Sequence, residues 1–359
     1  MHRLKVASRV LFASKERAWH SDEAAWQAYE RVRDAVAKMK VDAADGVARP
    51  SEYWNAELAN IDYLADASPL VIRKLRHHAF WITGLRAYDY RVQDDVQRDL
   101  FEMRLRALTK IGGADLVVAE PEVLGGFGYR IDGALYNLDT LKFLEVLVGL
   151  RTAGILDPLR AADRPVIVEV GGGWGGLAGQ LRTLIPHALY VIVDLPELFL
   201  FSAVHLSTVF PGARQVFWGA EPDAAERWRK ADFVFVPHTH AGAVSALAPS
   251  LVINVASFQE MTAAQVDAYA SIAARGGCQT IYSLNRERSR SNHELTSVSD
   301  VLSRYYDLRE IAVLDTDYTK AMKKRSKSRK ADAAPSADDA LSYKHIVGQL
   351  RASPYQSRR

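Results

Sequence analysis

The chain has 359 residues, one cysteine and a formal net charge of +3, with 48% apolar and 25% charged residues. These values are ordinary for a globular protein, and the length allows two domains or one domain with a large appendage. The single Cys278 excludes an internal disulfide framework and is typical of a reducing compartment, so we expect a cytoplasmic protein. No apolar run approaches the roughly 20 residues of a membrane span, and Met1–Trp19 lacks the apolar core of a signal peptide.

From Ser21 to Lys110 apolar residues recur at three- and four-residue spacing, which predicts helices. Ser68-Pro69 is typical of a helix start with proline in the first turn. Because no strand pattern accompanies these helices, residues 1–114 are predicted to form a helical N-terminal extension. It would cap the remaining chain or provide the surface of a homodimer. Trp54 and Trp81 are expected to pack within it, although a sugar-binding platform uses the same side chains.

Glu120–Asn137 contains four glycines and two tyrosines without a helical period, which predicts an ordered loop or a short hairpin. A helix is expected from about Leu138 to Gly154, with Asn137 or Asp139 as its N-cap.

From Val166 onward, strand and helix patterns alternate, which predicts an α/β fold with a doubly wound, mostly parallel sheet. Gly276-Gly277 after Arg275 is a typical helix end. Helices are expected near residues 175–185, 196–209 and 262–275, and strands near 166–170, 189–193, 214–218, 233–237, 251–256, 278–283 and 309–314.

A glycine-rich loop follows the first of these strands. Its pattern Glu-x-Gly-x-Gly-x-Gly resembles the loop that binds S-adenosylmethionine (SAM) in class I methyltransferases, where the carboxylate near the strand end receives the cofactor's ammonium group. The next strand ends in an aspartate, which is suited to accept the ribose hydroxyls, and a tryptophan after the third strand is suited to pack on the adenine. The predicted cofactor-binding residues are Glu169, Gly171, Gly173, Gly175, Asp194, Leu195 and Trp218.

The same loop also satisfies Gly-x-Gly-x-x-Gly, the fingerprint of dinucleotide sites, with Asp194 on an NAD ribose. Glu169, however, would place negative charge beside a pyrophosphate, which a nucleotide site avoids and an ammonium site needs. SAM is therefore favoured. An NAD-dependent sugar oxidoreductase and a non-catalytic scaffold with a methyltransferase fold remain the alternatives.

Two strand ends offer a general base for removing a proton from an acceptor hydroxyl. The strand at 233–237 is followed by His238 and His240, and histidine titrates near neutral pH. Since these histidines lack an evident carboxylate partner, no metal site is predicted. The strand at 251–256 is followed by Ser257 and Glu260, which form either part of a site or the start of the next helix. The predicted catalytic residues are His238, His240 and Glu260.

The segment V-I-N-V-A-S-F-Q-E-M at 252–261 is similar to one in the bacterial sugar O-methyltransferase family. The glycine loop, V-D-L-P-E at 193–197 and E-P-E-V-L-G-G-F-G-Y at 120–129 add to this resemblance, which covers about residues 115–318. It implies a Rossmann-like class I methyltransferase domain, SAM as cofactor, and a sugar hydroxyl in a surface polysaccharide or another glycan as acceptor. Asn254 lies inside a buried strand, where an unpaired amide costs about 1–3 kcal/mol, so it indicates a site or a structural network. The predicted acceptor-side residues are Tyr129, Tyr136, Asn137, Asn254, Ser257 and Gln259.

Residues 319–359 are predicted to form a basic, flexible tail. Lys320–Lys330 contains many cations and no acid, and an apolar island at 341–350 is expected to be a short docking helix. Clustered lysines bind phosphates, but the net charge is only +3 and no RNA-binding motif is present. No specific nucleic-acid partner is therefore expected, and weak contact with an anionic membrane surface is the alternative.

Overall fold

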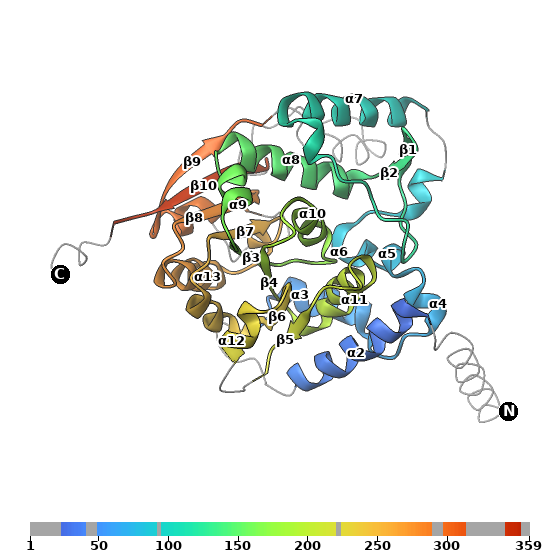
Figure 1. Ribbon diagram of the computed structural model, residues 1–359, viewed down its shortest axis with the longest axis horizontal. Coiled ribbons are helices and arrows are strands. Elements are labelled where there is room, and N and C mark those ends of the chain that lie inside the picture. The colour runs from blue at the N-terminus through green and yellow to red at the C-terminus, as the bar shows by residue number, and fades with distance from the viewer. Residues whose placement is uncertain are drawn as a thin grey trace.

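The computed structural model describes residues 23–40, 49–91, 95–219, 224–288, 297–313 and 342–352. Its centre is an eight-stranded sheet in the order β5-β6-β4-β3-β7-β8-β10-β9, with helices on both faces (Figure 1). The strands are β3 (Val166–Val170), β4 (Leu189–Asp194), β5 (Gln215–Phe217), β6 (Phe233–Pro237), β7 (Leu251–Val255), β8 (Thr280–Asn285), β9 (Tyr306–Ile311) and β10 (Lys344–Leu350).

Strands β3 to β8 are mutually parallel, and only β10 runs antiparallel to its two neighbours. After β3 the chain adds β4, β5 and β6 on one side of β3. It then crosses over and adds β7 on the opposite side of β3. The carboxyl end of β3 is therefore a topological switch point, where α/β sheets bind ligands. The predicted doubly wound, mostly parallel sheet is confirmed, as are the predicted strands.

Alternation along the buried strands divides the apolar residues between two cores, because successive side chains point to opposite faces. In β3, Ile167 faces one core, whereas Val166 and Val168 face the other. The first face is covered by α8 (Leu138–Thr152), α9 (Leu156–Ala161), α10 (Gly176–Leu184), η5 (Pro196–Leu198) and α11 (Phe199–Val209). The second face is covered by α12 (Ala224–Arg229), η6 (His238–Leu247), η7 (Phe258–Glu260), α13 (Ala263–Arg275) and α14 (Val298–Leu302).

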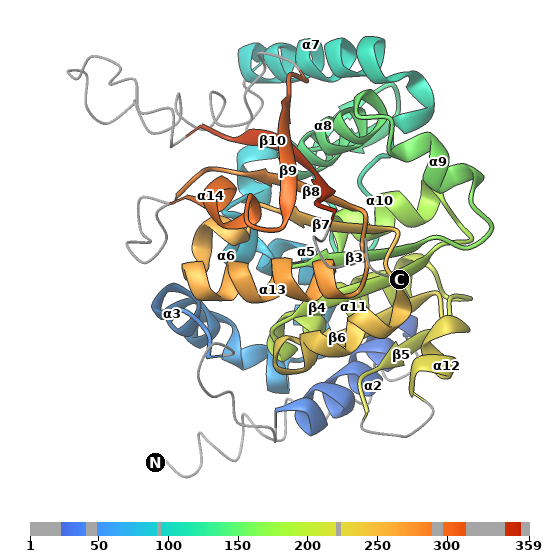
Figure 2. The ribbon, with the colours of Figure 1, turned by 90° about the vertical axis from the view of Figure 1, so that its left-hand side faces the viewer.

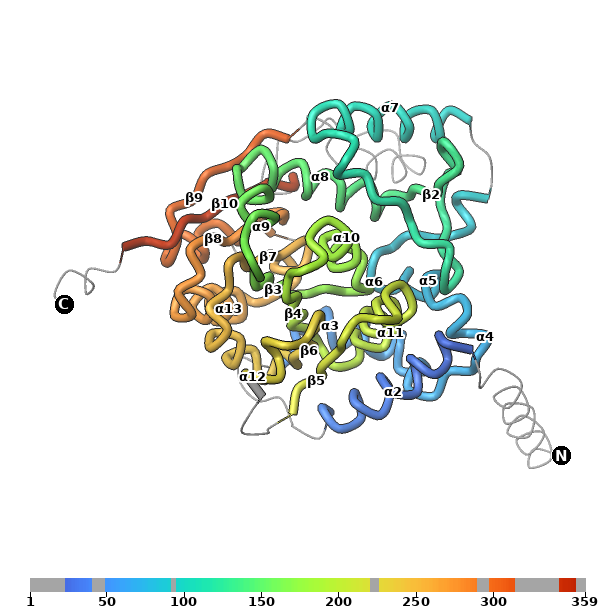
Figure 3. Tube along the Cα trace, viewed as in Figure 1, coloured from blue at the N-terminus to red at the C-terminus, as the bar shows by residue number. Residues whose placement is uncertain are grey.

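The N-terminal extension is helical in all its described parts. Its elements are α2 (Ala24–Met39), α3 (Glu52–Ile61), η2 (Asp62–Asp66), α4 (Pro69–Ile72), α5 (Leu75–His78), α6 (Phe80–Thr83), η3 (Ala87–Tyr90), α7 (Asp95–Gly112) and η4 (Ala114–Leu116). Helix α2 runs alongside α11, as the tube in Figure 3 shows. Trp26 and Tyr29 of α2 belong to the same hydrophobic core as α8 and α11. The extension is thus continuous with the core of the sheet domain.

The glycine-rich segment before α8 contains the expected hairpin, formed by β1 (Tyr129–Ile131) and β2 (Ala134–Tyr136). Asn137 is the N-cap of α8, because its Oδ1 accepts hydrogen bonds from the backbone N–H of Asp139 and of Thr140, each at 3.0 Å. Thr140 Oγ1 in turn accepts the N–H of Asn137 at 2.9 Å and completes a capping box.

The docking helix predicted for the apolar island near the end of the chain is wrong, because Lys344–Leu350 forms strand β10 between β8 and β9 (Figure 2). A short apolar run has no periodicity that separates a buried strand from a helix. His345 fixes β10 in place: its Nδ1 lies 2.5 Å from the Tyr282 hydroxyl of β8, and its Nε2 lies 2.9 Å from Glu145 Oε1 of α8.

Among the residues described, no helix combines the length and the apolar character of a bilayer span. Both the Met1–Trp19 segment and the basic Lys320–Lys330 run lie outside the described residues.

Candidate active site

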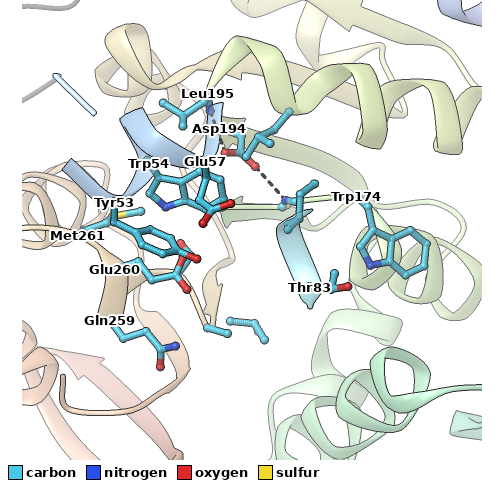
Figure 4. A pocket seen from close by; sticks show the side chains of 18 of the residues that line it. Tyr53, Trp54, Glu57, Thr83, Trp174, Asp194, Leu195, Gln259, Glu260 and Met261 are labelled. Carbon is cyan, nitrogen blue, oxygen red and sulfur yellow. Dashed lines mark hydrogen bonds between the residues drawn. The ribbon is translucent and has the colours of Figure 1, made fainter. Parts of the chain in front are cut away.

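A cavity of about 510 Å³ opens at the carboxyl ends of β3, β4, β6, β7 and β8. Its floor is the glycine loop after β3, and its walls are the segments after the other four strands. Helices α3 and α6 of the N-terminal extension also line it, as the close-up in Figure 4 shows for Tyr53, Trp54 and Thr83. The cavity therefore lies at the switch point of the sheet, between the sheet domain and its helical extension.

The glycine loop is held by two hydrogen bonds to β4 and one within the loop. Gly171, at φ +76°, donates its N–H to Val193 O at 2.8 Å. Gly173, at φ +55°, donates to Asp194 Oδ2 at 2.9 Å, and Gly175 donates to Gly172 O at 2.9 Å. A Cβ on Gly171 would come within 2.2 Å of Ser257 Oγ, so this position has no room for a side chain. Three amides of the loop are thus already engaged.

Two buried carboxyl groups flank the glycine loop. Glu169, at the end of β3, accepts a hydrogen bond from the Tyr190 hydroxyl at 2.9 Å. This bond lowers the pKa of Glu169, but burial has the larger effect and raises the pKa to about 8. Asp194, at the end of β4, accepts the N–H of Gly173 and also that of Leu195 at 2.8 Å (Figure 4). Burial raises the pKa of Asp194 to about 7, although these backbone donors oppose the rise. A cationic ligand would stabilise the ionised form of both groups.

Five of the seven residues predicted to bind the cofactor line the cavity, and Gly175 and Trp218 do not. Gly175, at φ +83°, instead lets the loop pass α11, because a Cβ there would lie 3.0 Å from Ser202 Cα. The Trp218 ring packs between Trp228 and His240, with centroid distances of 5.4 and 4.6 Å. Both residues make packing contacts outside the cavity, and their part in cofactor binding stays a prediction. The remaining five are Glu169, Gly171, Gly173, Asp194 and Leu195.

Asn254 organises the segment after β7 and does not itself line the cavity. Its fully buried amide donates to Val170 O at 2.8 Å and to Ser257 Oγ at 2.9 Å, and its Oδ1 accepts the N–H of Phe258 at 3.0 Å. The amide thereby joins the ends of β3 and β7 and orients the turn that follows. Of the two roles open to Asn254, the structure shows the structural network.

Gln259 and Glu260 follow this turn and line the cavity, together with Ser257. The Gln259 amide donates to the Tyr343 hydroxyl at 3.1 Å. The Glu260 carboxyl group projects into the cavity beside Tyr53 (Figure 4). Burial and the nearby Glu57 carboxylate raise the pKa of Glu260 to about 8. The next helix begins later than Ser257, since Thr262 is its N-cap and accepts the N–H of Gln265 at 3.2 Å.

The two candidate histidines have different surroundings. His238 lines the cavity, but both of its ring nitrogens are buried. His240 does not line it: the ring stacks on Trp218, and Nδ1 lies 2.9 Å from Thr239 Oγ1. His240 is therefore removed from the catalytic candidates. Within the described ranges, no cluster of three or more His, Cys, Asp or Glu side chains is arranged to hold a metal ion.

Tyr129, Tyr136 and Asn137 do not line the cavity either. Tyr129 and Tyr136 face each other across the β1–β2 hairpin, where the Tyr129 ring packs on Phe101 at 5.3 Å. Asn137 is fully buried as the cap of α8. That these three residues bind the acceptor stays a prediction, which their position outside the cavity does not support. Their sequence pattern reflects the turn and the helix cap.

The N-terminal extension supplies cavity residues that the sequence did not single out, namely Tyr53 and Glu57 of α3, beside Trp54. Two hydrogen bonds hold α3 against the segment after β7: Ser51 Oγ donates to Glu260 O at 3.0 Å, and Gln265 Nε2 donates to Arg49 O at 2.7 Å. Trp54 was the available sequence signal, since a tryptophan on a polar helix suggests a ligand platform. Nothing in the local sequence marked Glu57.

A buried ionic network connects the extension to the glycine loop. Arg76 of α5 donates to Glu120 at 2.8 Å and to Asp139 at 2.6 Å, and its guanidinium lies 3.8 Å from the centroid of the Trp174 ring. The Trp174 indole N–H donates to the same Asp139 at 3.1 Å, and Lys142 donates to it as well, at 3.1 Å. The opposing charges are balanced within the network, as buried ions require. The network fixes the glycine loop relative to α5 and α8.

No family model matches the chain, and no curated protein matches it. The solved structures that resemble it include methyltransferases. Precorrin-6y C5,15-methyltransferase from Geobacter metallireducens has 13% identity and a TM-score of 0.33, over 55% of this chain and 86% of that one. Human N-acetylserotonin methyltransferase, solved in complex with SAM, has 10% identity and a TM-score of 0.30, over 59% and 56%. An O-methyltransferase family protein from Burkholderia thailandensis has 11% identity and a TM-score of 0.30, over 60% and 61%.

This chain thus spans 56% and 61% of the lengths of the second and third of these proteins. The strand order shows a doubly wound, Rossmann-like sheet whose one antiparallel strand, β10, lies next to the edge.

Proposed function

We propose that the chain is a SAM-dependent O-methyltransferase that transfers a methyl group to a sugar hydroxyl in the synthesis of a surface polysaccharide or another glycan. One observation carries the proposal. The N–H groups of Gly171 and Gly173 are donated to β4, that of Gly175 is donated within the loop, and carboxyl groups flank the loop at the ends of β3 and β4. Such a site suits a ligand that has cationic and hydroxyl groups.

The alternative cofactor, NAD, is disfavoured by the same hydrogen bonds. A pyrophosphate site needs free backbone N–H groups and no nearby negative charge. Here the N–H of Gly173 is donated to Asp194, and Glu169 is buried beneath the loop. An NAD-dependent sugar oxidoreductase would have to displace Asp194 from Gly173.

The residues present fit SAM, which when bound supplies an electrophilic methyl group on a positively charged sulfur. Glu169 would hold its ammonium group, and Asp194 would hold its ribose hydroxyls. Lys142 lines the same end of the cavity and would receive the carboxylate. Residues of α3 and α6 line the cavity and would help to exclude water from the reacting groups.

Glu260 is the residue best suited to remove the acceptor's proton. Its carboxyl group projects into the cavity from the segment after β7. As an ionised carboxylate it accepts the hydroxyl proton while the acceptor oxygen attacks, and general-base catalysis of this kind contributes about 10²–10⁴ in rate. The Trp54 ring beside it offers a flat apolar surface for a sugar ring.

The identity of the cofactor can be tested by comparing the thermal stability of the protein in the presence of four ligands. SAM and S-adenosylhomocysteine, each at about 100 times its dissociation constant, are expected to stabilise the protein by about 2.7 kcal/mol, whereas NAD and NADP leave it unchanged. Differential scanning fluorimetry measures the shift. A rise in melting temperature with NAD would overturn the choice of cofactor. An unchanged melting temperature with all four ligands would favour a non-catalytic scaffold.

Asp194→Asn is expected to weaken SAM binding about 10- to 150-fold, because hydrogen bonds to a charged group contribute about 1.5–3 kcal/mol. The amide oxygen still accepts one backbone N–H, so the fold is retained. Isothermal titration calorimetry measures the affinity, and Asp163→Ala, an exposed carboxyl group before β3, is the control. Unchanged affinity in Asp194→Asn would contradict the assignment of Asp194 to the cofactor.

A further inference from the structure

Arg286 follows β8 and lines the cavity on the side of Gln259 and Tyr343. Its backbone N–H donates to Gln259 Oε1 at 3.0 Å. The guanidinium carbon lies 4.8 Å from the centroid of the Tyr343 ring, within the range of a cation–π contact. Both the backbone and the guanidinium group of Arg286 are therefore held against the cavity wall.

Arg286 lies near the Glu260 carboxyl group but makes no direct ion pair with it or with another carboxylate of the described residues. Its Nε is buried and has no hydrogen-bond partner among the residues that the structure describes. Over the same residues, none of the ion pairs within 4.0 Å involves Arg286, whereas Arg76 in the neighbouring network has two. A guanidinium cannot lose its proton, and the buried Nε–H group of Arg286 needs a hydrogen-bond acceptor. The partner of Arg286 is thus expected to be a ligand.

Arg286 belongs to the end of the cavity that holds Glu260. Burial raises the pKa of Glu260 and of Tyr343, and the positive charge of Arg286 opposes this rise in both groups. Lys142, by contrast, also acts on Glu169, which flanks the glycine loop, and Arg286 does not. Lys142 acts on Glu260 and Tyr343 as well, so it reaches both ends of the cavity, whereas Arg286 belongs to the acceptor end.

A neutral sugar would satisfy the carboxyl groups of Glu57 and Glu260 through its hydroxyls but would leave the guanidinium unmatched. The planar fork of an arginine pairs best with two oxygens of a carboxylate or a phosphate. We propose that Arg286 selects an acidic sugar, so that the acceptor of this enzyme carries a carboxylate or a phosphate group beside the hydroxyl that is methylated. This inference rests on the proposed sugar methyltransferase activity.

The test is calorimetric titration of the protein saturated with S-adenosylhomocysteine. The probes are methyl glucuronoside, glucose 1-phosphate and, as the neutral reference, methyl glucoside. One acidic sugar is expected to bind about 10- to 150-fold more tightly than the neutral one. Preference for the glucuronoside identifies a carboxylate as the recognised group, and preference for glucose 1-phosphate identifies a phosphate.

Arg286→Gln is expected to abolish this preference while the affinity for S-adenosylhomocysteine stays unchanged, and Arg286→Lys is expected to retain part of it. Arg288→Gln, which changes an exposed arginine outside the cavity, is the matched control. Equal binding of neutral and acidic sugars to the wild type overturns the proposal, as does a preference that survives in Arg286→Gln. Loss of S-adenosylhomocysteine affinity in Arg286→Gln would assign the arginine to the cofactor instead. If the wild type does not bind S-adenosylhomocysteine at all, the failure lies with the proposed function.

Discussion

Glu260→Gln is expected to lower kcat about 10²–10⁴-fold, because the amide cannot accept the proton of the acceptor hydroxyl. The glutamine keeps the size of the side chain and the polar contacts of the cavity wall, so SAM affinity is expected to stay the same. Transfer of a radiolabelled methyl group to the acceptor measures kcat. His238→Asn is the matched comparison: if it removes turnover while Glu260→Gln does not, the base is the histidine.

The pH dependence of the reaction gives a second measure of the same residue. The active form of the base is the carboxylate, and burial together with Glu57 raises the pKa of Glu260 to about 8. We therefore expect kcat/KM to rise with pH through an apparent pKa of about 8. Glu57→Gln removes the repelling charge, which lowers the pKa of Glu260, so the rise should move to lower pH. A profile that Glu57→Gln leaves in place would show that another group titrates.

Arg76→Met is expected to destabilise the protein by about 3–5 kcal/mol, since it leaves the buried carboxyl groups of Glu120 and Asp139 without their shared cation. Urea denaturation measures the free energy of unfolding. Arg73→Met is the control, because Arg73 is exposed and its ion pair with Glu23, at 3.5 Å, contributes at most about 1 kcal/mol.

Because Trp174 contacts Arg76, the Arg76→Met substitution is also expected to affect the cofactor site. The Trp174 ring lies under the Arg76 guanidinium and belongs to the glycine loop. Once the cation is removed, the loop is less well fixed, and SAM affinity is expected to fall together with stability. Equal unfolding free energies for Arg76→Met and Arg73→Met would show that the network does not hold the extension to the loop.

The parallel part of the sheet was predictable because strands buried on both faces are continuous apolar runs separated by amphipathic helices. The glycine loop and Asp194 were predictable for a related reason, since residues that directly follow parallel strands gather at one edge of the sheet. Those predictions required only local sequence and one rule of topology.

The acceptor half of the cavity was less predictable. Tyr53 and Glu57 lie more than a hundred residues before the glycine loop and enter the site only because α3 is held against the segment after β7. Such long-range packing leaves no local pattern. Polar residues in a glycine-rich stretch, such as Tyr136 and Asn137, suggested a site by composition, but the hairpin and the helix cap account for them.

The position of β10 determines when the sheet can be completed. During synthesis β8 and β9 both emerge earlier, yet they pair with β10 and not with each other. Until residues 344–350 are available, β8 is an open sheet edge that can pair with another chain. Strand β9 then has no neighbouring strand to which it can hydrogen-bond. A nascent or truncated chain that lacks this segment is therefore expected to aggregate. Docking of β10 also brings Tyr343 under Arg286, so the cavity and the sheet are finished in the same step.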